Sequence, residues 1–93
     1  MQAGRLEQRR AIITGGGRGI GAAIASAYRA EGAEVAIIDL DPATCDATAA
    51  HLGCHSVVAD LVDPDSARAA TTKAIDLLGG VDLLVNNAGI VDE

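Results

Sequence analysis

The chain has 93 residues, of which 13 are acidic and seven basic, giving a formal net charge of −6 at pH 7. Its 49% hydrophobic and 22% charged residues indicate a folded chain, and its length suffices for one small domain. The acidic balance argues against a nucleic-acid partner and against binding to an anionic membrane surface.

The N-terminus and the two cysteines bear on the cellular compartment. The first ten residues are polar and lead into no apolar run of the kind that a secretion signal contains. Cys45 and Cys54 are too few for a disulfide framework, so we expect a cytoplasmic protein. His51 and His55 lie near them in sequence, but the spacing matches no zinc-binding pattern, and we expect no metal site.

The N-terminal half of the chain predicts two strands joined by a helix. We expect a flexible leader over residues 1–9 and a folded domain over residues 10–93. A first strand is predicted over residues 9–14, and the nearly continuous apolar run Glu34–Asp39 predicts a second, buried on both faces. Between them, helical spacing predicts a buried stripe made of Ile20, Ala23, Ile24, Ala27 and Tyr28.

The second half predicts two further helices and two further strands. An Asp-Pro pair precedes each helix, where the aspartate can cap the helix and the proline fits its first turn. We therefore expect helices over residues 42–52 and 64–78 and strands over residues 56–59 and 83–85. With right-handed crossovers, this alternation predicts an α/β fold, a doubly wound parallel sheet of four strands in the order 3-2-1-4 with three helices. The buried stripe of the third helix is expected at Ala67, Ala70, Thr71, Ala74, Ile75 and Leu78.

The turn between the first strand and the first helix carries five glycines in seven residues, over residues 15–21. A pyrophosphate bound at a helix N-terminus comes close to the backbone, where a Cβ would obstruct it. A glycine turn in this place therefore predicts phosphate binding. Glycine clusters also occur in ordinary loops, so the turn by itself leaves both interpretations open.

Asp39 ends the second strand and lies about 20 residues beyond the glycine turn, where a carboxylate can accept hydrogen bonds from the hydroxyls of an adenosine ribose. The same carboxylate would repel the extra phosphate of NADP, so we expect NAD in preference to NADP. Arg18 is a weaker argument for NADP, because a guanidinium beside the turn could bind a 2′-phosphate. The structural alternative is that Asp39 is a capping or merely solvated residue.

The segments that follow the four strands are expected to meet. In a parallel sheet the strand C-termini share one edge, and open α/β sheets bind ligands there. These segments are residues 15–21, Asp39, Asp60 with Leu61, and residues 87–89. Their convergence predicts one dinucleotide site more strongly than any single motif does.

Two motifs, Thr14-Gly15-x-x-x-Gly19-x-Gly21 and Asn86-Asn87-Ala88-Gly89, together resemble the N-terminal half of the short-chain dehydrogenase/reductase family, which has a Rossmann-type fold. The likeness covers essentially all of residues 10–90. It implies an NAD(P)-dependent oxidoreductase that transfers hydride between a nicotinamide cofactor and an alcohol or carbonyl compound. Thr14 and Asn86 are expected to brace the turn and the sheet rather than to take part in chemistry.

The resemblance also implies a role for each part of the site. Residues 15–20 would hold the pyrophosphate and border the nicotinamide, and Asp39 would bind the adenine ribose. Asp60 and the backbone of Leu61 would touch the adenine, and residues 87–89 would line the cofactor channel. The expected cofactor-binding residues are Gly15, Gly17, Arg18, Gly19, Ile20, Gly21, Asp39, Asp60, Leu61, Asn87, Ala88 and Gly89.

The chain departs from the family in lacking its catalytic Ser and Tyr-x-x-x-Lys pair. Tyr28 is its one tyrosine and is followed four residues later by Gly32, while Lys73, its one lysine, lies within the third predicted helix. Tyr28 falls on an apolar helix stripe and is expected to pack in the core. We therefore expect no catalytic residue in this stretch and no activity from the 93 residues alone.

The predicted sheet is truncated after its fourth strand, which leaves that strand without an outer neighbour. We expect the chain alone to be marginally stable, to self-associate, or to need a missing C-terminal half as its partner.

Two alternatives remain open from the residues, and a third is excluded. A nucleotide-binding or assembly fragment without catalysis would also fit the absent Tyr-x-x-x-Lys. A methyltransferase that uses adenosylmethionine also places glycines after its first strand and an acid after its second, but it does not predict the Asn-Asn-Ala-Gly segment. A Walker-type phosphate loop fails, because Ala22 stands where its lysine is required.

Overall fold

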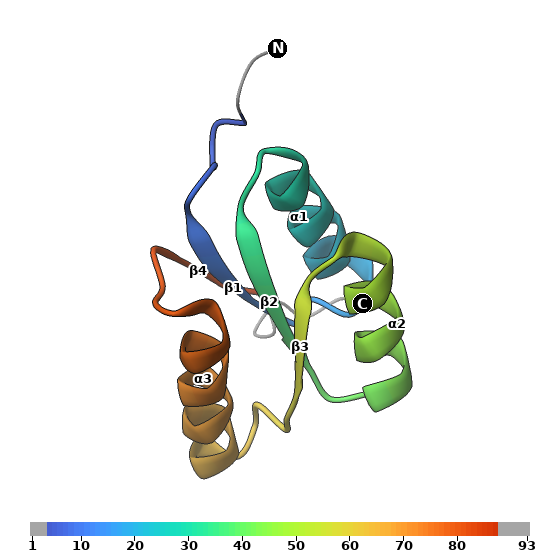
Figure 1. The fold of residues 1–93 in the computed structure, drawn as a ribbon. Helices are drawn as coiled ribbons and strands as arrows, with labels where there is room; N and C mark the ends of the chain where they lie inside the picture. Colours follow the sequence, from blue (N-terminus) through green and yellow to red (C-terminus); the bar gives the residue numbers. More distant parts are fainter. Residues whose placement is uncertain (1–3, 88–93) are drawn as a thin grey trace.

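The computed structural model describes residues 4–87, which form one parallel sheet with helices on both faces (Figure 1). The strands pair in the order β3-β2-β1-β4 and every pairing is parallel, which confirms the predicted fold class and topology. The elements are β1 (Arg10–Thr14), α1 (Gly19–Ala30), β2 (Glu34–Asp39), α2 (Pro42–Leu52), β3 (His55–Val58), α3 (Pro64–Leu78) and β4 (Leu83–Asn86).

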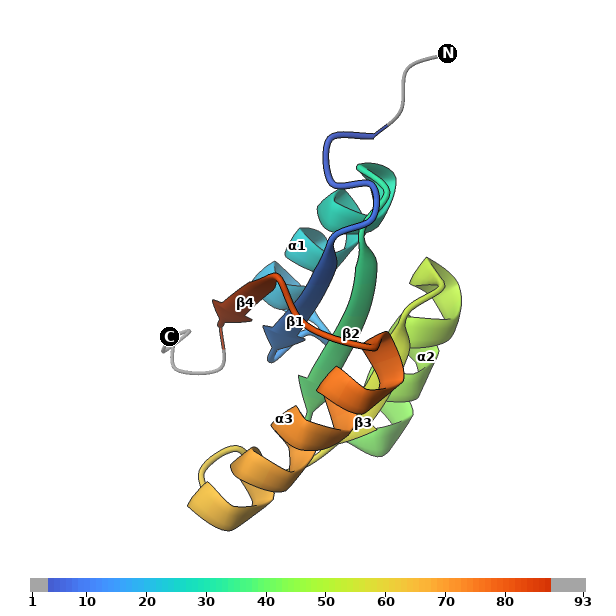
Figure 2. The ribbon, with the colours of Figure 1, turned by 60° about the vertical axis from the view of Figure 1, so that its left-hand side comes forward.

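The central strands are buried on both faces because helices cover each side of the sheet. Successive strand residues point to opposite faces. Ile13 and Ile37 therefore lie in one cluster with Cys45 of α2, into which α1 also packs. Ile12 lies in a second cluster with Ala74 of α3. Figures 1 and 2 show this separation, with α3 opposite α1 and α2. Burial on both sides explains why β1 and β2 have continuous apolar sequences.

Four strand ends differ by one residue from the prediction: the start of β1, both ends of β3, and the end of β4, which is Asn86 instead of Val85. β1 begins after Arg9, because the amide of Arg9 still donates to the carbonyl of Leu6 in the preceding turn, at 2.9 Å. β3 begins at His55, which pairs with Ala36 of β2. Ala59, predicted as the last residue of this strand, lies beyond the paired positions.

The helix ends follow their sequence signals, with one difference. The carboxylate of Asp41 accepts a hydrogen bond from the amide of Ala43 at 3.2 Å and so caps α2. Asp63 holds the equivalent position before α3 but makes no side-chain cap bond within residues 4–87. At its C-terminus α2 ends on Gly53, whose φ of 72° is left-handed, as a helix C-cap commonly requires.

Helix α1 is rotated about its axis relative to the predicted stripe, so the prediction is confirmed for Ile24 and Tyr28 and wrong for the other three positions. Ile20 is 56% exposed, and Ala23 and Ala27 are exposed as well. The residues that face the sheet are Gly21, Ile24, Ala25 and Tyr28. A side chain at Gly21 would overlap the carbonyl oxygen of Gly15, so this close approach decides which face of the helix turns inward. For α3 the predicted stripe is confirmed, with Ala70 and Ala74 buried at its centre.

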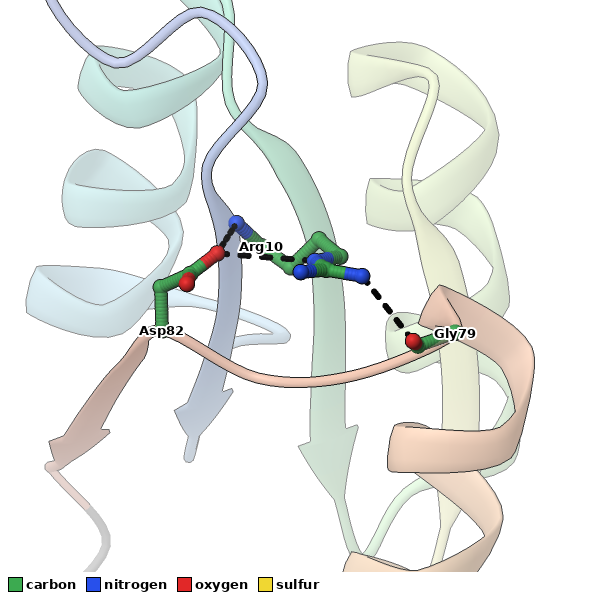
Figure 3. A network of polar contacts seen from close by, with 3 residues as sticks. All are labelled: Arg10, Gly79 and Asp82. Carbon is green, nitrogen blue, oxygen red and sulfur yellow. Dashed lines mark hydrogen bonds and ion pairs between the residues drawn. The ribbon is translucent and has the colours of Figure 1, made fainter.

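The start of β1 is tied to segments that lie far from it in the sequence. Nη1 of Arg10 donates to the carbonyl of Gly79, directly after α3, at 2.9 Å (Figure 3). Upstream, Leu6 packs against the core beneath α1, and its amide donates to the carbonyl of Glu31 at 2.8 Å. These bonds hold the first strand between α1 and α3.

Candidate functional site

The glycine turn follows β1 at the edge of the sheet where the strands end. The amide of Gly15 donates to the carbonyl of Ile38 at 2.7 Å, which joins the turn to the end of β2. Gly15 and Gly19 have positive φ values of 66° and 61°, a conformation that residues with a side chain rarely adopt. The path of the turn therefore requires glycine at these two positions.

The start of α1 packs directly onto this turn and onto the end of β4. Besides overlapping Gly15, a Cβ on Gly21 would lie 2.7 Å from Nδ2 of Asn87. That Nδ2 donates to the carbonyl of Gly15 at 3.2 Å. Asn87 is therefore in contact with the glycine turn that the sequence predicted it would meet, and it supports the turn from the β4 side.

Asp39 lies against the third glycine of the turn. Its Oδ2 accepts a hydrogen bond from the amide of Gly17, and its Oδ1 accepts one from the amide of Leu40, both at 2.8 Å. A Cβ on Gly17 would come within 2.6 Å of Oδ2, so only glycine leaves room for the carboxylate in this position. A carboxylate has about four lone-pair positions, so two backbone bonds leave acceptor capacity on both oxygens.

Thr48 of α2 also holds the glycine turn, and sequence analysis missed it. Its Oγ1 donates to the carbonyl of Gly17 at 2.5 Å. A threonine within a helix carries no local signal of such a contact, which spans 31 positions in the sequence. The available hint was its place in α2, three residues after the buried Cys45 and next to the buried Ala49, on the side of the helix that faces the sheet.

Thr14 and Asn86 join the ends of β1 and β4. Oγ1 of Thr14 lies 3.1 Å from Oδ1 of Asn86 and 3.3 Å from the carbonyl of Val85, within hydrogen-bond distance of both acceptors. These contacts agree with the bracing role expected for the two side chains. They also fix the strand that leads into Asn87.

Arg18 and Ile20 flank the glycine turn on its solvent side. Arg18 is the N-cap residue of α1 and is exposed, with an extended backbone. The pKa of Asp41 is lowered, chiefly by the hydrogen bond from the Thr44 hydroxyl at 2.6 Å and to a smaller extent by the positive charge of Arg18. The positive charge of Arg18 therefore acts on the residue that caps α2. Ile20, expected on the buried stripe, instead presents an apolar side chain to solvent beside the turn.

The remaining expected site residues follow β3 and β4. The exposed carboxylate of Asp60 accepts a hydrogen bond from the amide of Val62 at 3.0 Å. Leu61 is partly buried against the cluster beneath α3. The amide of Ala59 donates to the carbonyl of Asp39 at 2.9 Å, which keeps the segment after β3 beside the end of β2. Ala88 and Gly89 lie outside the described residues.

An open hollow of about 430 Å³ lies between α1 and α2. Its walls include Ala22, Ser26, Thr48 and His51. It lies along the two helices instead of at the carboxyl edge of the strands. Thr48 lines this hollow and is also hydrogen-bonded to the glycine turn.

Metal ligation and membrane spanning find no support in residues 4–87. Within that range no three His, Cys, Asp or Glu side chains lie close enough together to hold a metal ion. Likewise, none of the described helices is long and apolar enough to cross a bilayer. Cys45 and Cys54 are free, and burial raises the pKa of both thiols, which makes them poor nucleophiles near neutral pH.

Curated relatives resemble this chain over nearly all of its length. A sorbitol dehydrogenase of Cereibacter sphaeroides is 42% identical over 90 residues, and a galactitol 2-dehydrogenase of Agrobacterium fabrum is 46% identical over 90 residues. Each match covers 95% of this chain and 35% of the relative. The chain therefore spans about a third of the length of the curated relatives it matches.

Solved structures share its fold. A 3-ketoacyl-(acyl-carrier-protein) reductase from Brucella melitensis, complexed with NADH, superposes with a TM-score of 0.86 at 39% identity, over 91% of this chain and 36% of that one. The Pseudomonas aeruginosa RhlG/NADP active-site complex gives the same TM-score and identity, over 91% of this chain and 35% of that one. These neighbours include both an NADH and an NADP complex.

The family model for short chain dehydrogenases matches residues 9–93, which is almost the whole chain. This match excludes the methyltransferase alternative and agrees with the glycine turn, the acid at the end of β2, and the asparagines at the end of β4 and directly after it. Members of this family bind a nicotinamide dinucleotide. The chain belongs to the short-chain dehydrogenase/reductase family.

Proposed function

We propose that residues 10–93 are the dinucleotide-binding part of an NAD-dependent oxidoreductase, with residues 1–9 as a leader. The observation that carries the proposal is the contact between Asp39 and Gly17, in which the carboxylate lies 2.8 Å from the amide of the glycine turn. This contact brings an acid that can bind a ribose next to a turn that can bind a pyrophosphate.

The residues present fit a pyrophosphate at the start of α1. The first amides of a helix have no partner within the helix, and the helix dipole is positive at that end. In residues 4–87 no side chain caps the N-terminus of α1 and its first turn holds no acidic residue. A Cβ on Gly19 would meet no described atom within 4 Å, so the backbone at this position is open to close approach. These features favour an anion over the turn.

The Asp39 carboxylate supports NAD as the cofactor. Each of its oxygens already accepts one hydrogen bond from a backbone amide and can accept a further one from a ribose hydroxyl. A 2′-phosphate at the same place would meet a negative charge with no described cation bonded to it. Arg18 is the residue that would favour NADP, and we propose that the Asp39 carboxylate, which is hydrogen-bonded to the turn, outweighs it.

The remaining residues of the proposed cofactor site surround this pair. The exposed Ile20 offers an apolar surface beside the turn for the nicotinamide end of the cofactor, and Asp60 with Leu61 follows β3 at the adenine end. Asn87, Ala88 and Gly89 complete the proposed lining on the β4 side. When bound, the nicotinamide supplies hydride transfer to or from an alcohol or carbonyl compound.

We assign no catalytic residue to these 93 residues. They lack a Tyr-x-x-x-Lys pair, and Tyr28 packs against the core beneath α1. We therefore propose that the chain binds cofactor without turning over substrate on its own, which is also what a non-catalytic nucleotide-binding module would do. The free thiols of Cys45 and Cys54 support a reducing, cytoplasmic location.

The test is a calorimetric titration of the chain with NAD and with NADP, repeated on Asp39→Ala. We expect saturable binding of NAD, weaker binding of NADP, and a loss of this preference in the variant. Asp76→Ala, which removes an exposed carboxylate from α3, is the matched control and should bind as the wild type does. A folded chain that binds neither nucleotide would overturn the proposal.

A further inference from the structure

We infer that Thr48 of α2 is a positioning residue that holds Gly17 in the orientation in which it binds Asp39, and that it thereby sets the preference for NAD over NADP. The inference rests on the proposed function, because it concerns the ribose end of the proposed cofactor site. Thr48 itself need not touch the cofactor.

The first observation is that Gly17 is held on both sides of its Cα atom. Its amide donates to Oδ2 of Asp39 at 2.8 Å, and its carbonyl accepts a hydrogen bond from Oγ1 of Thr48 at 2.5 Å. A glycine in a turn has wide freedom in φ and ψ. Fixing the peptide groups on both of its sides removes that freedom, so the two hydrogen bonds act on one conformation.

The second observation is that Thr48 is anchored to the sheet. Cys45 and Ala49, three residues before it and one after, are both buried where α2 packs on the sheet. The thiol of Cys45 lies 3.9 Å from the carbonyl of Ile37 and 3.8 Å from that of Val57. The hydroxyl of Thr48 therefore approaches Gly17 from a helix whose position is set by β2 and β3.

The third observation is that the turn has little room to adjust on its other side. Gly16 is buried, and a Cβ on it would lie 2.6 Å from Cγ2 of Ile37. Gly15 is bonded to Ile38 and to Asn87. Gly17 is thus the one of these three glycines whose carbonyl depends on α2, and the Thr48 hydroxyl is the donor that α2 supplies.

Loss of this hydroxyl should act on cofactor choice. Without its donor, the carbonyl of Gly17 would turn toward water. The hydrogen bond from the Gly17 amide to Asp39 would then weaken as well. The carboxylate would then be free to rotate away from the ribose position. Because the proposed role of Asp39 is both to bind the 2′-hydroxyl and to repel a 2′-phosphate, a mobile carboxylate should weaken NAD binding and, by relieving the repulsion, should not weaken NADP binding.

The experiment compares the wild-type chain with Thr48→Val, which keeps the shape but removes the donor, and with Thr48→Ser, which keeps the donor. Thr48→Ala lacks the donor without adding a methyl group that could disturb packing. Thr72→Val, on an exposed position of α3, is the control for a lost hydroxyl elsewhere. Two quantities are measured: the hydrogen-exchange rate of the Gly17 amide without nucleotide, and the Kd for NAD and for NADP.

We expect Thr48→Val and Thr48→Ala to speed exchange at Gly17 and to raise the Kd for NAD about fivefold, the factor that corresponds to one ordinary hydrogen bond. Thr48→Ser and Thr72→Val should match the wild type. Unchanged exchange and NAD affinity in Thr48→Val and Thr48→Ala would overturn the inference while leaving the proposed function intact, as would an effect confined to Thr48→Val. A wild-type chain that binds neither nucleotide would instead overturn the proposed function, and the role in cofactor choice with it.

Discussion

Arg10 and Asp82 bind each other through both backbone and side-chain groups. Oδ2 of Asp82 accepts hydrogen bonds from the amide of Arg10 at 2.9 Å and from its Nε at 3.4 Å, while the amide of Asp82 donates to the carbonyl of Arg10 at 2.8 Å. The pair fixes the start of β4 beside the start of β1 (Figure 3). It thereby sets the register that brings Asn86 beside Thr14, at the edge that holds the candidate site.

Because of this pair, the free energy of unfolding should decrease at acidic pH. The hydrogen bond from the backbone amide of Arg10 is the main reason that the pKa of Asp82 is lowered from 3.8. A carboxyl group with a lowered pKa in the folded state stabilises that state above its unfolded pKa, and this stabilisation is lost as the pH falls through the folded pKa. We expect Asp82→Asn to lower the unfolding midpoint at pH 7, and the difference from the wild type to shrink below about pH 4.

The measurement is urea unfolding between pH 3 and pH 7, followed by circular dichroism. Asp65→Asn is the control, because Asp65 pairs with Arg68 on the open surface of α3, where ion pairs contribute little. A constant difference between Asp82→Asn and the wild type at all pH values would count against the assignment.

Ile37→Ala should be severely destabilising. Ile37 is fully buried in the cluster between the sheet and the helices α1 and α2. Removing such a side chain leaves a cavity and costs roughly 2–5 kcal/mol, a large share of a total stability of about 5–15 kcal/mol. Val62→Ala, at a position that is 90% exposed, should change the free energy of unfolding by less than about 0.5 kcal/mol. The free energies of unfolding are measured by chemical denaturation. Equal changes in Ile37→Ala and Val62→Ala would mean that Ile37 is not in the core.

Gly21→Ala and Gly19→Ala should both destabilise the fold, but for different reasons. At Gly21 the new Cβ would overlap the carbonyl of Gly15 and approach Asn87, so α1 must move away from the turn. At Gly19 the space is open, but φ is 61°, which costs an alanine about 1–2 kcal/mol. We expect the side-chain amide resonances of Asn87 to shift strongly in Gly21→Ala and to stay in place in Gly19→Ala. NMR spectra of the two variants provide the comparison, and a shift of the same size in both would contradict this reading.

Leu84→Lys should reduce self-association of the chain. Leu84 is 63% exposed on β4, which lies at the edge of the described sheet, and unpaired edges with apolar side chains favour association. Sedimentation velocity at two protein concentrations should show association of the wild type and less of it in the variant. Val62→Lys adds the same charge at an exposed loop position and should behave as the wild type does. A monodisperse wild-type monomer with a sharp melt that does not depend on concentration would contradict the expectation.

The order and type of the elements follow from the amino-acid sequence alone. The signals are local: apolar runs for the strands, apolar residues at helical spacing, Asp-Pro pairs where helices start and glycines where they end. The strand and helix ends that were predicted from them therefore differ from the observed ends by no more than one residue. With right-handed crossovers these elements allow one sensible sheet order. That order brings Gly17 and Asp39 to the same edge, which is why their meeting could be predicted across 22 positions in the sequence.

The rotation of α1 and the contacts that hold the glycine turn depend on the packing of the whole fold. An alanine-rich helix has several nearly equivalent apolar faces, so the stripe through Ile20 could not be told from the one through Gly21 until the backbone of Gly15 was in place. The hydrogen bond from Thr48 to Gly17 and the pairing of Arg10 with Asp82 join distant segments through ordinary polar side chains. Such contacts leave no local pattern, because they depend on where the folded chain brings each donor to its acceptor.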